Sequence, residues 1–297
     1  MPRHDGRPNN DCTPIPTCEV PLVEVDYARL VDYHVHHERC GHAMEPMAAY
    51  VRAALARGLG EMGFSDHLWQ YWLPPERRDP ELGMREEQLA EYVAEARALR
   101  RAHPEIRLRL ALEVDYIPAQ ERALEPLLAR HAWDYLLGSV HFLGEWGFDQ
   151  ERQLDEYARR DVDAVYLEFF DLVGQAAESG LFDVMTHVDL PKKFGHRPRG
   201  DLGPAQRRLA ERLARAGVAI EVNTSGLRKP VGEIYPSLGL LTLLCEAGVP
   251  ATLSSDAHRP EDVGADFDRA LEHLRQAGYR EYAAFEGRRR ALRPLPR

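Results

Sequence analysis

Residues 29–36 have the sequence RLVDYHVH, an apolar run that ends on two histidines. The run predicts a buried β-strand, in which alternate side chains point to the same side. His34 and His36 therefore share one face and can chelate one metal ion. The alternative for this motif alone is a histidine-rich surface turn, because a chain with 13 histidines readily produces a His-x-His pair by chance.

The same arrangement recurs along the chain, which argues against chance. Apolar runs also end at His67, His141, His187 and the motif Ser255-Asp256-Ala257-His258, while residues 108–112 end at Glu113. The strand ends thus offer nine candidate ligands: His34, His36, His42, His67, Glu113, His141, His187, Asp256 and His258. Nine are too many for one ion. We expect two or three divalent ions (Zn, Mn or Fe), which favour imidazole and carboxylate ligands.

Strand and helix signals alternate from residue 22 onward. The predicted strands are 29–36, 61–65, 107–114, 135–140, 182–187, 218–223 and 251–255. The predicted helices are 47–57, 85–103, 119–131, 154–179, 204–216, 238–247 and 262–277. Seven βα units with short connections predict an α/β, TIM-like barrel with its metal site at the C-terminal ends of the strands. The alternative is a doubly wound open sheet, whose site would gather at one switch point instead of spreading over many strand ends.

No linker divides residues 22–297, so we expect a single domain. Residues 1–21 are rich in Pro and Asn and lack hydrophobic periodicity, which predicts a mobile N-terminal extension. The four cysteines form no CxxC pair and no secretory signal precedes the domain, so we expect a reduced, cytoplasmic setting. Cys40 is expected to be a small buried thiol, with a metal ligand as the alternative.

The balance of charge restricts the partners. A formal net charge of −10 argues against a nucleic-acid-coating surface, and the absence of a long apolar run argues against a membrane span. An anionic substrate would need metals or local cations to attract it. Our candidates for binding it are Lys192, Lys193, Arg197, Arg228 and Lys229, with solvated loop charges as the alternative.

The ordered motifs resemble the metal-binding series of the PHP family of metal-dependent phosphoesterases, named for polymerase and histidinol phosphatase. They are His34-Val35-His36, Cys40-Gly41-His42, Asp66-His67, Glu113, His141, His187 and Asp256-Ala257-His258. Residues 32–36, 138–142, 221–228 and 255–258 are similar to the histidinol-phosphatase branch. The resemblance implies a distorted (β/α)7 barrel with a trinuclear site. It also implies hydrolysis of L-histidinol phosphate to L-histidinol in histidine biosynthesis.

The resemblance further implies how the ligands divide among the ions. One ion would take His34, His36, Glu113 and Asp256, a second would share Glu113 and take His141 and His187, and a third would take His42, His67 and His258. We expect in-line attack by hydroxide with no phosphoenzyme, because metals activate water without a side-chain nucleophile. Glu113, Asp256 and His258 are the catalytic candidates, and Asp256 or His258 could protonate the departing alkoxide.

Two other functions stay open at this point. The chain could be a PHP-type phosphoesterase that acts on another small phosphomonoester or on nucleic acid, although its acidic balance disfavours the latter. It could also be a noncatalytic metal-binding protein, although structural zinc sites are closed and usually rich in cysteine. We expect a small-molecule phosphomonoester as the partner, with no nucleic acid and no membrane.

Overall fold

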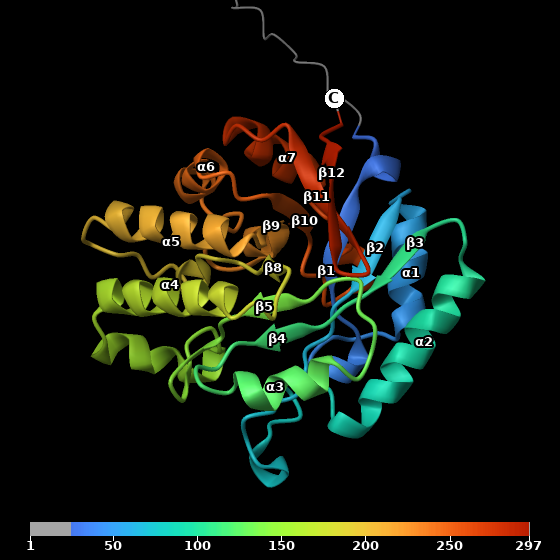
Figure 1. The fold of residues 1–297 in the computed structure, drawn as a ribbon, viewed down its shortest axis with the longest axis horizontal. Coiled ribbons are helices and arrows are strands. Elements are labelled where there is room, and N and C mark those ends of the chain that lie inside the picture. The colour runs from blue at the N-terminus through green and yellow to red at the C-terminus, as the bar shows by residue number, and fades with distance from the viewer. Residues whose placement is uncertain (1–24, 297) are drawn as a thin grey trace, which may run out of the picture.

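The computed structural model describes residues 25–296, so the extension expected over residues 1–21 lies outside the described part of the chain. Strands occupy the centre and helices surround them (Figure 1). The central strands are β1 (Val31–Val35), β2 (Glu61–Phe64), β3 (Arg107–Leu110), β4 (Glu113–Asp115), β5 (Leu137–Ser139), β8 (Val184–Met185), β9 (Ala219–Asn223) and β10 (Ala251–Ser254).

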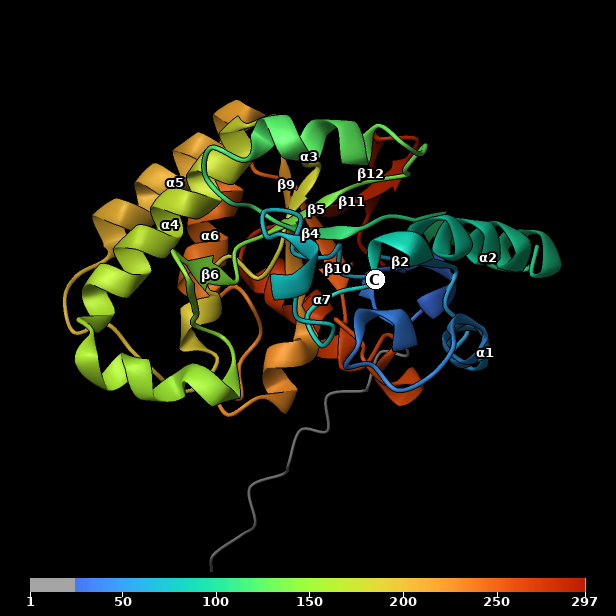
Figure 2. The same cartoon turned by 90° about the horizontal axis from the view of Figure 1, so that it is seen from below.

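Each strand or strand pair is followed by a helix, as the alternating signals predicted. The helices are α1 (Met47–Ala56), α2 (Leu89–Ala102), α3 (Glu121–Leu128), α4 (Val162–Glu178), α5 (Gly203–Ala216), α6 (Leu238–Glu246) and α7 (Phe267–Gln276). Figure 2 shows them arranged around the strands. Short 3-10 helices cover Tyr27–Arg29, Glu38–Cys40, Pro75–Arg77, Glu86–Gln88, Leu190–Lys192, Thr224–Arg228 and Pro260–Asp262.

The strands form two parallel sheets that join into a ring. One sheet has the order β1-β2-β3 and the other β10-β9-β8-β5-β4. A parallel bridge between Val35 and Ala257 joins β1 to the end of β10, and a second bridge joins His67 to Glu113. The expected α/β barrel of seven βα units is thereby confirmed. Its strands all end on one side, where the candidate ligands lie.

The third barrel strand is broken, which distorts the ring. We predicted one strand over 107–114, but Ala111 and Leu112 separate β3 from β4. β3 pairs with β2, whereas β4 pairs with β5. The backbone hydrogen bonds at the break show the same change of partner strand. The Ala111 N–H donates to the Phe64 carbonyl in β2, whereas the Leu112 carbonyl accepts from the Leu137 N–H in β5. The break lies just before Glu113.

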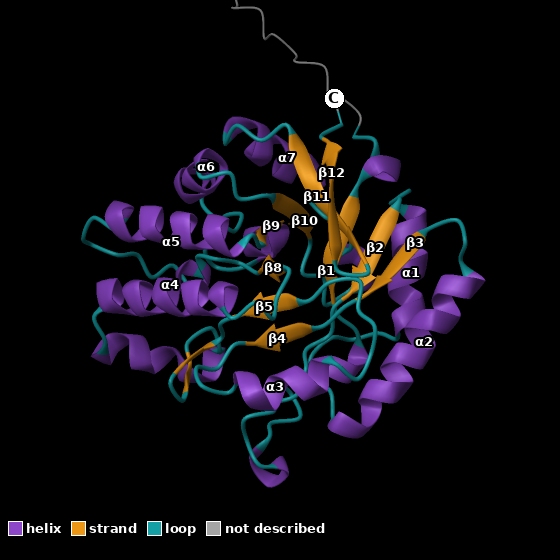
Figure 3. Ribbon diagram, viewed as in Figure 1, coloured by secondary structure: helices purple, strands orange, loops and turns teal. Residues whose placement is uncertain are grey.

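Two other elements differ from the prediction. The helix expected over 154–179 is split into a 3-10 helix, Glu151–Arg159, and α4. Asp161 separates them because its side chain accepts a hydrogen bond from the Asp163 N–H at 3.1 Å and caps α4. A C-terminal hairpin, β11 (Glu281–Glu286) and β12 (Arg289–Pro294), was not predicted (Figure 3).

A small hairpin after β5 completes the list of strands, with β6 (Phe142–Leu143) and β7 (Trp146–Gly147). The core consists of strand and helix side chains, and every residue of β1 is buried. Within residues 25–296, no helix has both the length and the apolar character needed to cross a membrane.

Candidate metal centre

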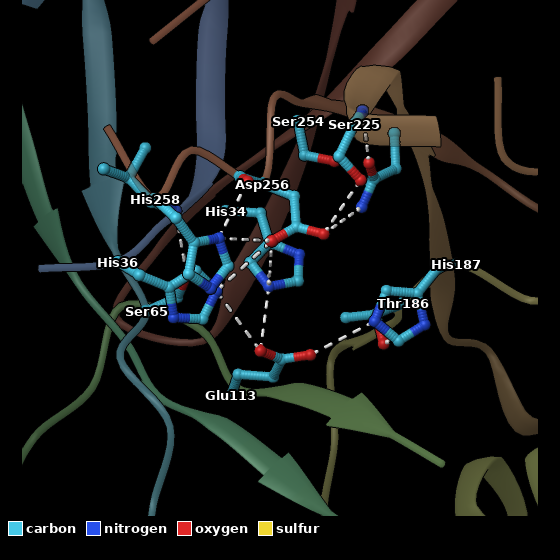
Figure 4. A network of polar contacts seen from close by, with 12 residues as sticks. His34, His36, Ser65, Glu113, Thr186, His187, Ser225, Ser254, Asp256 and His258 are labelled. Carbon is cyan, nitrogen blue, oxygen red and sulfur yellow. Dashed lines mark hydrogen bonds and ion pairs between the residues drawn. The ribbon is translucent and has the colours of Figure 1, made fainter. Parts of the chain in front are cut away.

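The predicted ligands converge at the C-terminal ends of the barrel strands (Figure 4). A cavity of about 260 Å³ opens over them and is lined by seven of the nine: His42, His67, Glu113, His141, His187, Asp256 and His258. His34 and His36 are fully buried behind this layer. Residues from six different parts of the ring therefore meet at one point.

Glu113 lies at the centre of the group and is only 1% exposed. Its Oε2 is 2.9, 3.3 and 3.0 Å from ring nitrogens of His34, His36 and His67. Its Oε1 is 3.3 and 3.5 Å from the Nε2 atoms of His187 and His141. The two oxygens thus face two different sets of imidazoles, as a carboxylate that bridges two ions would.

A further group of ligands lies on the other side of His36. The Nε2 atoms of His42 and His258 are 2.9 Å apart, and the rings of His36 and His258 stack at 4.1 Å. Asp256 Oδ1 is 3.5 Å from His36 Nε2. Five groups of potential ligand atoms lie mutually within 4.8 Å: His34–His36–Asp256, His36–His67–His258, His67–Glu113–His141, Cys40–His42–His258 and His36–Cys40–Asp66. The last two include Cys40, which is fully buried, as expected of a small thiol, and lies close enough to the centre to keep its alternative role as a metal ligand open. This spacing suits several ions that share neighbouring ligands.

Backbone geometry directs two of the ligands into the centre. His187 and Asp256 each lie two residues after the end of a strand, and their φ angles are 24° and 51°. These left-handed conformations cost roughly 1–3 kcal/mol each for residues other than glycine. Such strain is concentrated at functional sites, where the surrounding structure enforces it.

Acceptors behind the imidazoles fix their tautomers. Glu221 Oε2 is 2.9 Å from His34 Nδ1, and Asp115 Oδ1 is 2.8 Å from His141 Nδ1. The Glu81 carbonyl is 2.7 Å from His42 Nδ1. Because each Nδ1 carries a proton toward its acceptor, each Nε2 presents a lone pair to the centre. Glu221 also accepts the His187 N–H at 2.9 Å, which explains a buried glutamate near the site that is not a ligand.

The electrostatics favour a positive charge at this point. Burial alone would lower the pKa of His34, but Glu113, Glu221 and Asp256 raise it well above its ordinary value. Burial alone would raise the pKa of Glu113, but His34 and His67 hold it well below its ordinary value. The carboxylates therefore stay ionised and stabilise whatever cation lies among them.

Several buried ligand atoms have no hydrogen-bond partner among residues 25–296. Among them are His34 Nε2, His36 Nε2 and Glu113 Oε2. Buried polar atoms are normally satisfied, and these face one another in the centre. Metal ions would supply the missing partner for each, so the residues present fit a cluster of divalent ions.

Of the five predicted substrate-binding cations, two line the cavity and three do not. Lys193 and Lys229 line the cavity. Lys192 is 1% exposed and bonds Asp189 at 2.8 Å. Arg197 pairs with Glu233 at 2.5 Å.

Arg228 is held by neighbouring loops. It donates to the Ser255 carbonyl at 2.6 Å and pairs with Asp262 at 3.3 Å. Like Lys192 and Arg197, it is not among the residues that line the cavity.

Sequence reasoning missed several residues that complete the cavity. Asp115, Asp149, Ser225 and Tyr235 line it beside the ligands. Asp115 follows Glu113 by two residues on a strand, so its position on the same face could have been inferred from the alternation. Asp149 and Tyr235 lie outside the helices and strands, and Ser225 lies in a 3-10 helix of five residues, so no periodicity indicates the direction of their side chains.

A model of the PHP domain matches residues 32–225, well over half of the chain. The chain therefore belongs to the PHP domain family. Within this family, it is 42% identical over 253 residues to a protein of Deinococcus radiodurans named probable histidinol-phosphatase, covering 84% of this chain and 95% of the relative. A histidinol-phosphatase of Bacillus subtilis is 27% identical over 265 residues, covering 81% and 98%. The resemblance to the histidinol-phosphatase branch is confirmed.

Solved structures share the fold. The crystal structure of a histidinol phosphate phosphatase from Lactococcus lactis, in complex with zinc, L-histidinol and phosphate, has a TM-score of 0.75 at 20% identity and covers 89% of this chain and 99% of that chain. The structure of a putative histidinol phosphatase from Listeria monocytogenes has a TM-score of 0.72 at 23% identity, covering 80% and 99%. Both confirm the predicted barrel.

Proposed function

We propose that this protein is a metal-dependent histidinol-phosphatase, which hydrolyses L-histidinol phosphate to L-histidinol and phosphate in L-histidine biosynthesis. The chemistry is supported by the converging ligands around Glu113. The substrate is supported by the 42% identity to a probable histidinol-phosphatase over most of both chains. The reaction class is phosphoric monoester hydrolysis, and divalent metal ions are the cofactors.

We further propose two to three ions per chain, drawn from Zn, Mn and Fe. His34, His36, Glu113 and Asp256 would hold one, Glu113, His141 and His187 a second, and His42, His67 and His258 a third. The two oxygens of Glu113 face different imidazoles, which supports the proposal that this carboxylate is shared by two ions. The 2.9 Å approach of His42 Nε2 to His258 Nε2 supports the third set, because two ring lone pairs repel unless a cation lies at them.

The reaction needs relief of negative charge and a proton for the leaving group. When bound, the ions lower the pKa of water and neutralise charge on the phosphate oxygens. Lys193 and Lys229 line the same cavity and are placed to bind those oxygens. Asp256 and His258 also line it, and we propose that one of them accepts the proton released by the attacking water and passes it to the departing alkoxide. Glu221 and Asp115 keep His34 and His141 in the tautomers that face the centre.

Charge in the cavity agrees with this assignment. Four lining residues are carboxylates (Glu113, Asp115, Asp149 and Asp256) and two are lysines. A phosphate dianion would be repelled by this lining unless divalent ions reversed its charge. The cavity volume of about 260 Å³ also suits a small molecule better than a nucleic acid.

A phosphate-release assay tests the proposal. The panel contains L-histidinol phosphate, other small phosphomonoesters and oligonucleotides, each with Mn or Zn added, and oligonucleotide cleavage is followed by gel electrophoresis because a hydrolysed phosphodiester releases no free phosphate. We expect the highest kcat/KM for L-histidinol phosphate and none for oligonucleotides. A higher kcat/KM for another phosphomonoester would support the alternative of a PHP phosphoesterase with a different substrate. No release from any of them would favour a noncatalytic metal-binding protein.

A further inference from the structure

Asp149 is a cavity carboxylate that the metal centre does not use. Of the four carboxylates lining the cavity, Glu113 and Asp256 are ligands and Asp115 holds the ring of His141. Asp149 belongs to none of the groups of potential metal ligands that lie within 4.8 Å of one another. It follows β7 on a loop at the cavity wall, with its side chain 15% exposed.

The hydrogen bonds of Asp149 are incomplete. Lys193 Nζ donates to its Oδ2 at 3.1 Å and to its backbone carbonyl at 2.8 Å. Its Oδ1 is buried and has no hydrogen-bond partner within the described chain. An ionised carboxylate accepts several hydrogen bonds, and a buried one without donors is costly. A donor from a ligand would therefore stabilise it.

A carboxylate at this position works against phosphate binding by itself. It repels a dianion, and it also occupies Lys193, one of only two lysines that line the cavity. Its presence is favourable for a substrate that brings a positive group as well as a phosphate. Phe142, Leu190 and Tyr235 line the cavity with it and provide apolar contacts for the body of such a molecule.

We infer that Asp149 is a specificity-determining residue that binds the ammonium group of the substrate, so that the site selects phosphomonoesters of amino alcohols. This inference rests on the proposed function, since L-histidinol phosphate carries an amine as well as a phosphate. Asp149 is then the counterpart of the metal centre: the ions hold the anionic end of the substrate, and the carboxylate holds the cationic end. A phosphomonoester without the amine gains nothing from Asp149.

The test compares two substrates that differ only in the amine: L-histidinol phosphate and its deamino analogue, imidazolylpropyl phosphate. In Asp149→Asn, we expect kcat/KM for L-histidinol phosphate to fall about 10- to 100-fold, mainly through KM, because one charge-assisted hydrogen bond is lost. Any effect that passes through Lys193 is shared by the analogue, so the ratio of the two kcat/KM values should fall by about 10-fold or more. Asp149→Glu keeps the charge and should keep part of the preference. Glu151→Gln, an exposed glutamate two residues away, is the matched control and should change neither substrate.

The outcomes separate the inference from the function on which it rests. Equal loss on both substrates would mean that Asp149 only positions Lys193, and it would overturn the inference. No loss on either substrate would overturn it as well. Metal content and circular dichroism of each variant show whether the centre and the fold are intact. A wild-type enzyme that hydrolyses neither compound would contradict the proposed function itself, and the inference with it.

Discussion

At the scale of single residues, Glu113 decides how the centre is organised. Five imidazoles lie within 3.5 Å of its two oxygens, divided between Oε2 and Oε1. Ser139 Oγ also donates to Oε1 at 2.6 Å, which fixes the carboxylate plane. A carboxylate held in this way can neutralise two neighbouring cations at once.

Replacing Glu113 by Gln keeps the shape and removes the charge. We expect turnover to fall by at least about 100-fold, because the amide no longer stabilises two adjacent ions. The variant should still fold, as judged by circular dichroism. Glu125→Gln, on an exposed position of α3, is the control and should retain full turnover. Turnover near the wild-type value in a metal-loaded Glu113→Gln protein would contradict the bridging role.

Asp115 tests the residues behind the ligands. Asp115→Ala removes the acceptor at 2.8 Å from His141 Nδ1, so this ring loses its fixed tautomer. We expect metal affinity to fall by about 10- to 100-fold, measured by competition with a chelator. Asp155→Ala, an exposed aspartate, provides the comparison. Unchanged affinity would show that Asp115 does not orient the ligand.

At the scale of elements, breaks in regular structure position the site. The strand that sequence periodicity predicts over 107–114 is divided at Ala111 and Leu112, and Glu113 begins the second part. The long helix expected after β5 is divided at Asp161 in the same manner. In both places the sequence periodicity continues without a break, although the element itself ends and the chain changes direction.

The cap at Asp161 can be tested on stability alone. Asp161→Ala removes the acceptor for the Asp163 N–H, and loss of such a cap costs about 1 kcal/mol. We expect the free energy of unfolding to fall by this amount, with kcat and KM unchanged. Glu168→Ala, exposed in the middle of α4, should have a smaller effect. Equal stability of Asp161→Ala and wild type would mean that the division of the helix does not depend on this cap.

At the scale of the whole molecule, one buried carboxylate contributes to the attachment of the C-terminal hairpin to the barrel. Glu61, in β2, is fully buried and contacts Tyr33, Arg109 and Arg293 at 2.6, 2.7 and 2.8 Å. Arg293 lies in β12, so this network joins the last strand of the chain to the second. Arg109 also reaches Glu286 in β11 at 3.2 Å.

Glu61→Gln should destabilise the protein by on the order of 3 kcal/mol, because it removes the buried charge that pairs with Arg109 at 2.7 Å and leaves this arginine only the exposed Glu286 and a 4.0 Å contact with Asp134. Burial raises the pKa of Glu61, but the hydrogen bonds from Tyr33 and Arg109 outweigh it and lower the pKa below the ordinary value of 4.5. The folded state therefore binds this proton less readily than the unfolded state. The stabilisation is complete above the ordinary pKa and is lost as the pH falls through the folded one.

The prediction is tested by measuring how the free energy of unfolding depends on pH. The difference in free energy of unfolding between wild type and Glu61→Gln should be constant near neutral pH and should shrink as the pH falls below about 4.5. Denaturant unfolding at a series of pH values measures it, with Glu281→Gln in β11 as the exposed control. A difference that does not change with pH would show that the Glu61 charge does not hold the hairpin.

The order of the elements and the convergence of the predicted metal ligands could be derived from the sequence itself. Periodicity distinguishes strands from helices locally, and ligands that directly follow apolar strands must meet where parallel strands end. His34, His67 and Asp256 could therefore be assigned to one centre although they are far apart along the chain. These features depend on short-range patterns, which a single sequence contains.

Only the tertiary structure decided which of the predicted cations line the cavity. Lys192, Lys193, Arg228 and Lys229 looked equivalent in sequence, but only Lys193 and Lys229 of these four line the cavity. Lys192 and Arg228 pair with Asp189 and Asp262 away from it, whereas Lys193 pairs with Asp149 in its wall. The place of Asp149 in the cavity wall and the contacts of Glu61 with Tyr33, Arg109 and Arg293 were likewise found only in the structure. The direction of a loop side chain depends on partners from distant segments, and no local periodicity encodes those contacts.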